Sequence, residues 1–267
     1  MSRVPVMLSI AGSDPSGGAG VQADLKAASA LGVYGACVLT ALTVQNTVGV
    51  TGVHAVPAAF VADQYRAVVT DLDVRAVKIG MLGAAETAAA VAGVLTELPV
   101  PHVVLDPVMI ATSGDRLVPE ETIRVIREEL APLCTVITPN LPETAALTGG
   151  AEPTDRASMI AAGRELLTLG PAAVLVKGGH LGGETSDDVL VTAGGVHDLP
   201  ADRVHTPNTH GTGCTLSSAI AARLTCGDDL PTAVTAAKDY LTRDLRAGAA
   251  LEFGAGSGPV DHLWPVR

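Results

Sequence analysis

Short apolar stretches alternate with longer alanine-rich stretches along most of the chain. The apolar stretches predict strands at 4–10, 36–42, 76–79, 102–105, 135–138 and 173–176. The stretches between them predict helices at 21–31, 58–70, 85–98, 120–130, 141–147 and 156–169. Strands that alternate with helices predict an α/β fold with a mostly parallel central sheet and helices on both faces.

This alternation changes after Lys177. Residues 188–192 and 196–199 flank the turn sequence AGG, which predicts a small β-hairpin. A helix after NTHGTGC and another at about 231–247 follow. No segment has the composition of a linker, so we expect a single domain over residues 1–267.

Composition and charge limit the classes of function. Hydrophobic residues make up 48% of the 267 residues and charged residues only 17%, which is enough apolar material for a large core. The net charge of −11 argues against a nucleic acid or an anionic membrane as partner. It leaves room for a small phosphate pocket, because backbone amides and one lysine can bind phosphate.

The spacing of the cysteines and the first apolar run indicate in which cellular compartment the protein works. Cys37, Cys134, Cys214 and Cys226 lie far apart with no C-x-x-C, which argues against a zinc cluster or a disulfide framework. The first apolar run, residues 6–11, is too short for a signal peptide or a membrane span. We therefore expect a cytoplasmic protein with reduced thiols.

The segment from Asn208 to Cys214 has the composition of an anion-binding helix start. Gly211 and Gly213 permit a tight turn, and the amides of Thr212, Gly213 and Cys214 would point out of the helix N-terminus. The helix dipole is expected to lower the pKa of the Cys214 thiol from about 8.5 toward neutrality. The alternative is a glycine turn before an ordinary helix, with a small buried cysteine.

A second glycine-rich segment, IAGSDPSGGAG, follows the first strand. It has neither the G-K-[ST] ending of a P-loop nor the G-x-G-x-x-G of a dinucleotide site, so it could be a plain turn. Asp24 falls one turn into the next helix. It could point back toward a ligand at the sheet edge, or it could be a solvated helix acid.

Other polar residues follow predicted strands. Asn140 and Glu143 would share one side of a helix start, where they suit Mg²⁺ carried by a nucleotide or form a capping box. Lys177 ends a strand before two glycines, where it could reach a phosphate or extend from the sheet edge to solvent. Asp106 could contact a cation or phosphate-bound water, and the amide of Gln45 could bind a ring, or either could be an ordinary loop residue. Because these strand ends converge in a doubly wound sheet, we expect one ligand site.

Together these motifs resemble a known family. IAGSDPSGGAGVQADLKAASALGVYG, LTVQNTVGV, VKIGML, LDPVMIATSGDRL, ITPNLPE, VLVKGGH and NTHGTGCTLSSAIAA are similar, in order, to hydroxymethylpyrimidine/phosphomethylpyrimidine kinases of thiamin biosynthesis, which belong to the ribokinase superfamily. The resemblance covers nearly the whole chain. It implies a ribokinase-like fold and a transferase that uses Mg²⁺ with ATP, and dimers are usual for such proteins.

The resemblance also implies an activity and residue roles. Such kinases phosphorylate 4-amino-5-hydroxymethyl-2-methylpyrimidine and then its monophosphate. By position, Gln45 would bind the aminopyrimidine, Asp24 and the Gly12 backbone would hold the ring, and Met81 and Val108 would lie nearby. Gly211, Thr212 and Gly213 would form the anion hole. The Mg-ATP phosphates would be served by Asn140, Glu143 (through water to Mg²⁺) and Lys177, with Asp106 close by and Lys238 near the nucleotide.

Cys214 stands where sugar kinases of the superfamily have aspartate, so the resemblance implies that its thiolate takes the proton of the acceptor alcohol. Two other readings stay open. One is a pyridoxine/pyridoxal kinase on the same fold, and the other is a non-catalytic pyrimidine-binding protein.

Overall fold

The computed structural model describes residues 4–109 and 118–266. Residues 110–117, which belong to the LDPVMIATSGDRL motif, lie outside this part. The strands are β1 (Val6–Ala11), β2 (Tyr34–Leu39), β3 (Ala41–Gln45), β4 (Val50–Ala55), β5 (Val74–Ile79), β6 (His102–Leu105), β7 (Val136–Ile137), β8 (Ala173–Val176), β9 (Asp188–Thr192) and β10 (Gly195–Leu199). The α-helices are α1 (Gly20–Ala30), α2 (Ala58–Val69), α3 (Ala85–Glu97), α4 (Glu120–Val125), α5 (Leu141–Thr148), α6 (Arg156–Leu167), α7 (Thr212–Thr225) and α8 (Leu230–Gly248).

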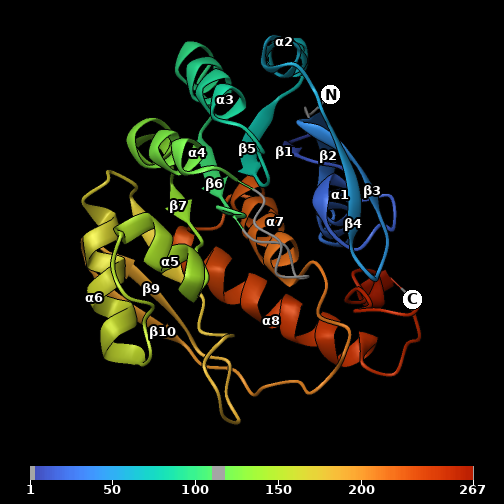
Figure 1. The fold of residues 1–267 in the computed structure, drawn as a ribbon, viewed down its shortest axis with the longest axis vertical. Helices are drawn as coiled ribbons and strands as arrows, with labels where there is room; N and C mark the ends of the chain where they lie inside the picture. Colours follow the sequence, from blue (N-terminus) through green and yellow to red (C-terminus); the bar gives the residue numbers. More distant parts are fainter. Residues whose placement is uncertain (1–3, 110–117, 267) are drawn as a thin grey trace.

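The central sheet has eight strands in the order β10-β9-β8-β7-β6-β5-β1-β2. The six strands from β8 to β2 are parallel, and β9 and β10 are added antiparallel to their neighbours. All residues of β1 and β8 are buried, as expected for strands covered on both faces. The predicted mostly parallel α/β sheet is confirmed (Figure 1).

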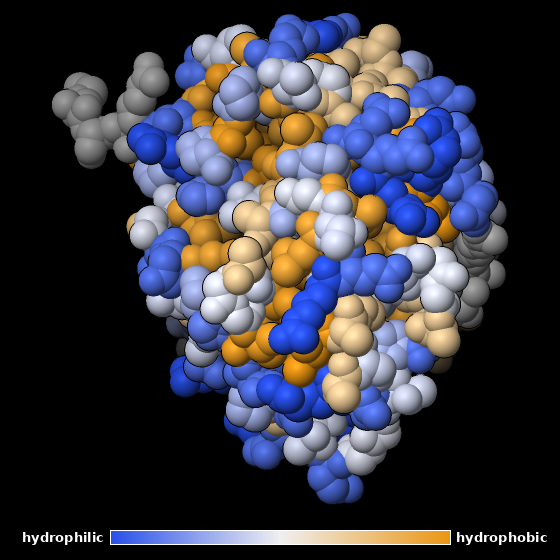
Figure 2. Space-filling view, turned by 90° about the vertical axis from the view of Figure 1, so that its left-hand side faces the viewer, coloured by the Kyte–Doolittle hydropathy of each residue, from blue (hydrophilic) through white to orange (hydrophobic). Residues whose placement is uncertain are grey.

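Helices cover both faces of this sheet. The helices α1, α7 and α8 bury alanine-rich faces on one side, and α2 to α6 pack on the other. Small side chains such as Ala219, Ala221 and Ala222 let α7 lie close to the sheet. Figure 2 shows apolar residues interspersed among polar ones on one face, as in most folded chains. No helix among the described residues is long and apolar enough to cross a bilayer.

Several predicted boundaries were wrong. The predicted strand 36–42 is divided at Thr40, whose amide and carbonyl bond to Ala11 and Val56, and the chain leaves the main sheet there. It then forms a separate hairpin, β3–β4, that the sequence did not predict, because its half-exposed strands carry little apolar signal. The predicted hairpin does form, as β9–β10, but it extends the main sheet.

The predicted helix 120–130 also differs. It is α-helical only to Val125 and continues as a π-helical turn over Ile126–Leu130 and a 3₁₀ turn over Ala131–Leu133. Pro132 has no amide hydrogen to donate to the preceding turn, so helical structure ends close to this position, in the 3₁₀ turn.

Candidate active site

A cavity of about 700 Å³ opens at the carboxyl ends of the parallel strands, a size typical of sites for small ligands. Predicted site residues from loops far apart in the sequence line it together. They are Gly12, Gln45, Met81, Asp106, Val108, Asn140, Glu143, Lys177, Gly211, Thr212, Gly213, Cys214 and Lys238. Of the predicted set, only Asp24 is not part of the lining.

Two glycine-rich loops touch at one wall of this cavity. Gly211 has φ +79°, and a Cβ atom there would lie 1.8 Å from the carbonyl oxygen of Gly18. Gly20 has φ +58°, and a Cβ atom there would lie 2.4 Å from the carbonyl oxygen of Gly12. These positions need glycine both for the left-handed backbone and for the close approach. The glycines therefore bring the start of α7 against the loop after β1.

The start of α7 is arranged as an anion site. Among the described residues no side chain caps the helix, and the Thr212 amide makes only a long bond of 3.4 Å to the Thr209 carbonyl oxygen, so the first turn can donate to a ligand. A Cβ atom on Gly213 would lie 3.3 Å from Asp106 Oδ2 and 3.4 Å from Lys177 Nζ. The helix dipole and the Lys177 ammonium therefore favour an anion at the same place.

Lys177 lies between two buried carboxylates. Its Nζ is 2.8 Å from Asp106 Oδ1 and 3.8 Å from Glu143 Oε2. Burial raises the pKa of Asp106, but Lys177 and Lys78 outweigh it and hold that pKa below its ordinary value. Burial and the charge of Asp106 raise the pKa of Glu143 to about 7 although Lys177 opposes this. The ammonium group of Lys177 is therefore paired with carboxylates of the protein itself.

Asn140 and Glu143 form the capping box that the sequence left open. Asn140 Oδ1 accepts from the Glu143 amide at 2.9 Å, and Glu143 Oε2 accepts from the Asn140 amide at 2.8 Å. Both residues also line the cavity. Capping and ligand binding are thus compatible here, because the cap fixes the two side chains at the cavity wall.

The thiol of Cys214 faces the same space, but its predicted ionisation was wrong. Burial first, and then the charges of Asp24 and Asp106, raise the pKa of the Cys214 thiol to about 11. Lys78 and the Gly20 amide oppose this rise without cancelling it. The helix dipole does not prevail, because burial removes the solvent that would stabilise the thiolate, and Asp24 and Asp106 from other elements add negative charge.

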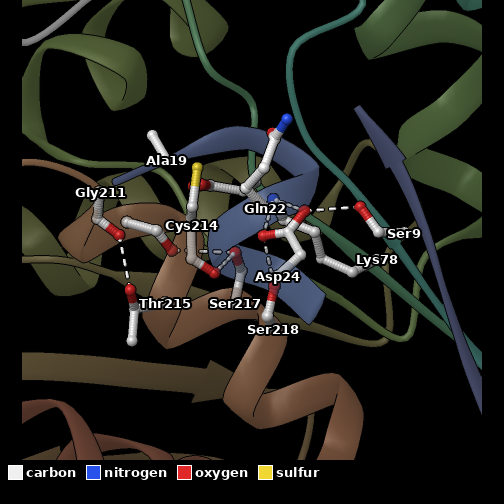
Figure 3. Close-up of polar contacts among 12 residues, drawn as sticks. Ser9, Ala19, Gln22, Asp24, Lys78, Gly211, Cys214, Thr215, Ser217 and Ser218 are labelled. Atoms are coloured by element: carbon white, nitrogen blue, oxygen red, sulfur yellow. Dashed lines mark hydrogen bonds and ion pairs between the residues drawn. The ribbon is translucent and has the colours of Figure 1, made fainter. Parts of the chain in front are cut away.

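Asp24 is also placed differently from the prediction. It is completely buried, and its carboxylate binds Lys78 Nζ at 2.9 Å through each oxygen. The hydroxyls of Ser9 and Ser218 donate to it at 2.5 and 2.6 Å (Figure 3). Asp24 is therefore neither a ring ligand at the cavity surface nor a solvated helix acid in this structure.

Lys238 is a buried residue of α8 in the wall of the cavity. Its Nζ donates to Asp188 Oδ2 and to the Ser186 carbonyl oxygen, each at 2.6 Å. Asp188 also accepts from the Gly178 amide at 2.9 Å. Lys238 thus ties α8 to β9 and to the loop that follows Lys177.

Asp14 and His210 are cavity residues that the sequence reasoning missed. His210 Nε2 is 2.8 Å from Asp14 Oδ2 and 3.5 Å from Gln45 Nε2. Burial raises the pKa of Asp14, but bonds from His210, Ser16 and the Ala19 amide outweigh it and lower that pKa to about 2. Both residues stand inside the two glycine-rich motifs, and that position was the available signal.

Within the described residues, no three His, Cys, Asp or Glu side chains converge as a metal site. Two carboxylates of the cavity wall, Asp106 and Glu143, lie on either side of the Lys177 ammonium group. This arrangement suits a metal ion that arrives with a phosphate ligand better than a resident one.

This chain is similar in sequence and in structure to several known kinases. The family model described as phosphomethylpyrimidine kinase matches residues 14–261. A hydroxymethylpyrimidine/phosphomethylpyrimidine kinase from Rhizobium meliloti is 52% identical over 97% of each chain. The crystal structure of phosphomethylpyrimidine kinase from Clostridium difficile is 41% identical, with a TM-score of 0.80 over 90% of this chain and 99% of that one. An ADP complex of Bacillus subtilis pyridoxal kinase is 35% identical, with a TM-score of 0.90 over 98% of each chain.

We expect Gly211→Ala to damage both stability and ligand binding. The left-handed φ costs about 1–2 kcal/mol for alanine, and crowding against Gly18 adds about 1–3 kcal/mol. Gly32→Ala is the matched control, because Gly32 has φ +77° but open space around its Cβ position. Denaturant unfolding should show the larger loss for Gly211→Ala. Equal losses in the two variants would show that the contact with Gly18 carries no weight.

Proposed function

This chain belongs to the phosphomethylpyrimidine kinase family, and we propose that its cavity phosphorylates hydroxymethylpyrimidine and then the resulting monophosphate in thiamin biosynthesis. The observation that carries the proposal is that Gln45, Lys177 and Cys214 line one cavity although they stand on β3, after β8 and on α7. A ring-binding amide, a phosphate-binding cation and a proton acceptor are the groups that such a reaction needs.

The pyrimidine would bind beside the β3–β4 hairpin. Thr43 Oγ1 lies 3.1 Å from Gln45 Oε1, and Gln45 Nε2 lies 3.5 Å from His210 Nε2, so these two neighbours orient the amide in the cavity wall. Met81 lies against Gly12, where an added Cβ would be 2.5 Å from its Cε atom. Gly12, Met81 and Val108 would then form the walls of a slot for a flat ring.

The transferred phosphoryl group would bind at the start of α7. The amides of Gly211, Thr212 and Gly213 would stabilise the charge that develops on its oxygens. Lys177 would leave Asp106 for the phosphates of ATP, whose charge is larger than that of one carboxylate. Lys238, paired with Asp188 in the cavity wall, would lie near the nucleotide.

Mg²⁺ would be held mainly by the phosphates of ATP. Asp106 Oδ2 faces Gly213, and one oxygen of Glu143 is engaged in the capping box, which favours contact with the ion through water. The bound ion would supply positive charge to the phosphates during transfer.

The two phosphorylations differ in their need for a base. In the first, the acceptor hydroxyl oxygen forms a bond to the γ-phosphorus, the bond to the departing ADP oxygen breaks, and the hydroxyl proton moves to Cys214 Sγ. In the second, the acceptor is an ionised phosphate and has no proton to lose. With a pKa raised to about 11, the thiolate is a scarce but strong base.

A second candidate function is phosphorylation of vitamin B6 alcohols. The likeness to pyridoxal kinase from Bacillus subtilis, at a TM-score of 0.90, favours it. The two functions would differ in the group that the Gln45 amide binds, an aminopyrimidine or a hydroxypyridine.

We also propose a homodimer that works in the cytoplasm. Large apolar side chains are exposed on the edge strand β2, on the β3–β4 hairpin and at the start of α2: Tyr34, Val44, Val53 and Phe60 are each more than half exposed. Such a group of side chains is typical of a surface that another subunit covers. All four cysteines are free thiols, as a reducing compartment would keep them.

Sedimentation of Val44→Glu against the unaltered chain would test the dimer, since a charge at this exposed apolar surface should shift the protein from dimer to monomer.

Product formation from single substrates tests the function directly. With Mg-ATP, the purified chain should convert the pyrimidine alcohol to its monophosphate, and the monophosphate, offered alone, to the diphosphate. Pyridoxine and pyridoxal should have lower kcat/KM values than the pyrimidine alcohol. Consumption of ATP with none of these acceptors would instead favour a pyrimidine-binding protein without kinase activity.

Cys214→Ala should separate the two phosphorylations. Phosphorylation of the alcohol should fall about 10²–10⁴-fold, the usual contribution of a general base, while phosphorylation of the monophosphate should change little. Steady-state kinetics with each acceptor measures both. Equal losses would reject proton transfer to Cys214.

The pH dependence provides an independent measure. Because the pKa of the Cys214 thiol is raised to about 11, the thiolate fraction increases about tenfold for each pH unit between pH 7 and 9. The logarithm of kcat/KM for the alcohol should therefore rise with a slope near one in this range. The monophosphate reaction should lack this rise, and a flat profile for the alcohol would exclude the free thiolate as base.

A further inference from the structure

A buried ion pair contacts α7 one turn after Cys214 and has no part in the mechanism above. Asp24 of α1 and Lys78 of β5 are both completely buried. Ser9 of β1 and Ser218 of α7 donate their hydroxyls to the same carboxylate. Four elements of the fold therefore meet at one charged group (Figure 3).

Stability alone does not account for this pair. Removing two charges from water costs several kcal/mol per ion, and apolar residues of similar volume often serve the fold equally well. The position of the pair relative to the cavity offers a better reason for its presence.

The pair contacts α7 one turn beyond the thiol. Ser218 follows Cys214 by four residues, so the two side chains lie on the same face of the helix. The first residue of α1, Gly20, directs its amide to the Cys214 sulfur, and Asp24 one turn later holds Ser218. The helix α1 thus fixes α7 at two successive turns of the face that carries the thiol.

The pair also acts on the charge of the sulfur. The charged groups that influence Cys214 come from three elements besides its own: Asp24 from α1, Lys78 from β5, and Asp106 after β6, with Lys177 after β8 influenced in turn. Burial, and then the charge of Asp24, also raise the pKa of the Cys37 thiol on β2. Of the cations, Lys78 has the largest influence on the sulfur and is the one that no bound ligand can reach.

We propose that Asp24 and Lys78 are positioning residues for Cys214: Lys78 stabilises the thiolate charge, Asp24 limits that stabilisation, and the bond from Asp24 to Ser218 holds the thiol at the acceptor site. This inference rests on the proposed function only in that the thiolate accepts the proton of the alcohol. Neither residue touches the substrate.

The proposal predicts opposite effects for two nearly isosteric substitutions. Lys78→Met removes the positive charge and should move the thiolate titration of Cys214 to higher pH, with about tenfold less thiolate at a given pH. Asp24→Asn keeps the shape and an oxygen that can accept from one of the two serine hydroxyls, but it removes the negative charge, so it should give about tenfold more thiolate. The double variant should fall between them.

The measurement is the ultraviolet absorbance of the thiolate during a pH titration of the unliganded full chain. Subtracting the titration of the same variant with Cys214→Ala isolates this thiol from the other three. A role in packing alone would loosen both variants alike, so shifts in the same direction, or no shift, would overturn the proposal. If Lys78→Met does not fold, Asp24→Asn alone decides, because only a shift to lower pH agrees with the proposal.

Arg156 and Asp198 supply the matched control. They form an ion pair at 2.7 Å with both side chains more than half exposed, so Arg156→Met and Asp198→Asn should leave the titration unchanged. Alcohol phosphorylation should fall in Lys78→Met while monophosphate phosphorylation is largely kept. Because the titration needs no turnover, opposite shifts would uphold the positioning role even if the Cys214→Ala kinetics rejected the base.

Discussion

The contact between Gly211 and Gly18 determines much of the geometry of this protein. It joins the start of α7 to the loop after β1 with no room for a side chain on either backbone. Since α7 also packs on the centre of the sheet, this contact sets how far its first turn stands above the strand ends. The Cys214 thiol, which this first turn carries, is placed in the cavity by the same contact.

The net charge of this kinase is strongly negative, although its substrates carry negatively charged phosphates. Its cations are paired with carboxylates, Lys177 with Asp106 and Lys238 with Asp188. Pairing keeps buried charges tolerable in the absence of ligand, and phosphates of higher charge can compete for the same ammonium groups. A net charge of −11 therefore says little about the cavity, where the local arrangement of ions matters more.

The same point explains the behaviour of Cys214. A thiol at a helix start is favoured as an anion when the helix is considered alone. Here Asp24 and Asp106 approach it from α1 and from the end of β6, and burial removes the solvent that would screen them. The result is a thiol that is almost entirely protonated at neutral pH, although the charge of the buried Lys78 opposes the rise in its pKa.

The α/β class, the mostly parallel sheet, the family and the loops that line the cavity could all be predicted from the residues alone. Apolar strands, alanine-rich helices and glycine motifs are local patterns, and local patterns specify local structure. The assembled fold was needed to show that Asp24 is a buried partner of Lys78, that His210 pairs with Asp14 and that the thiol is held protonated. Those outcomes depend on distances between residues from different elements, which no spacing along the chain records.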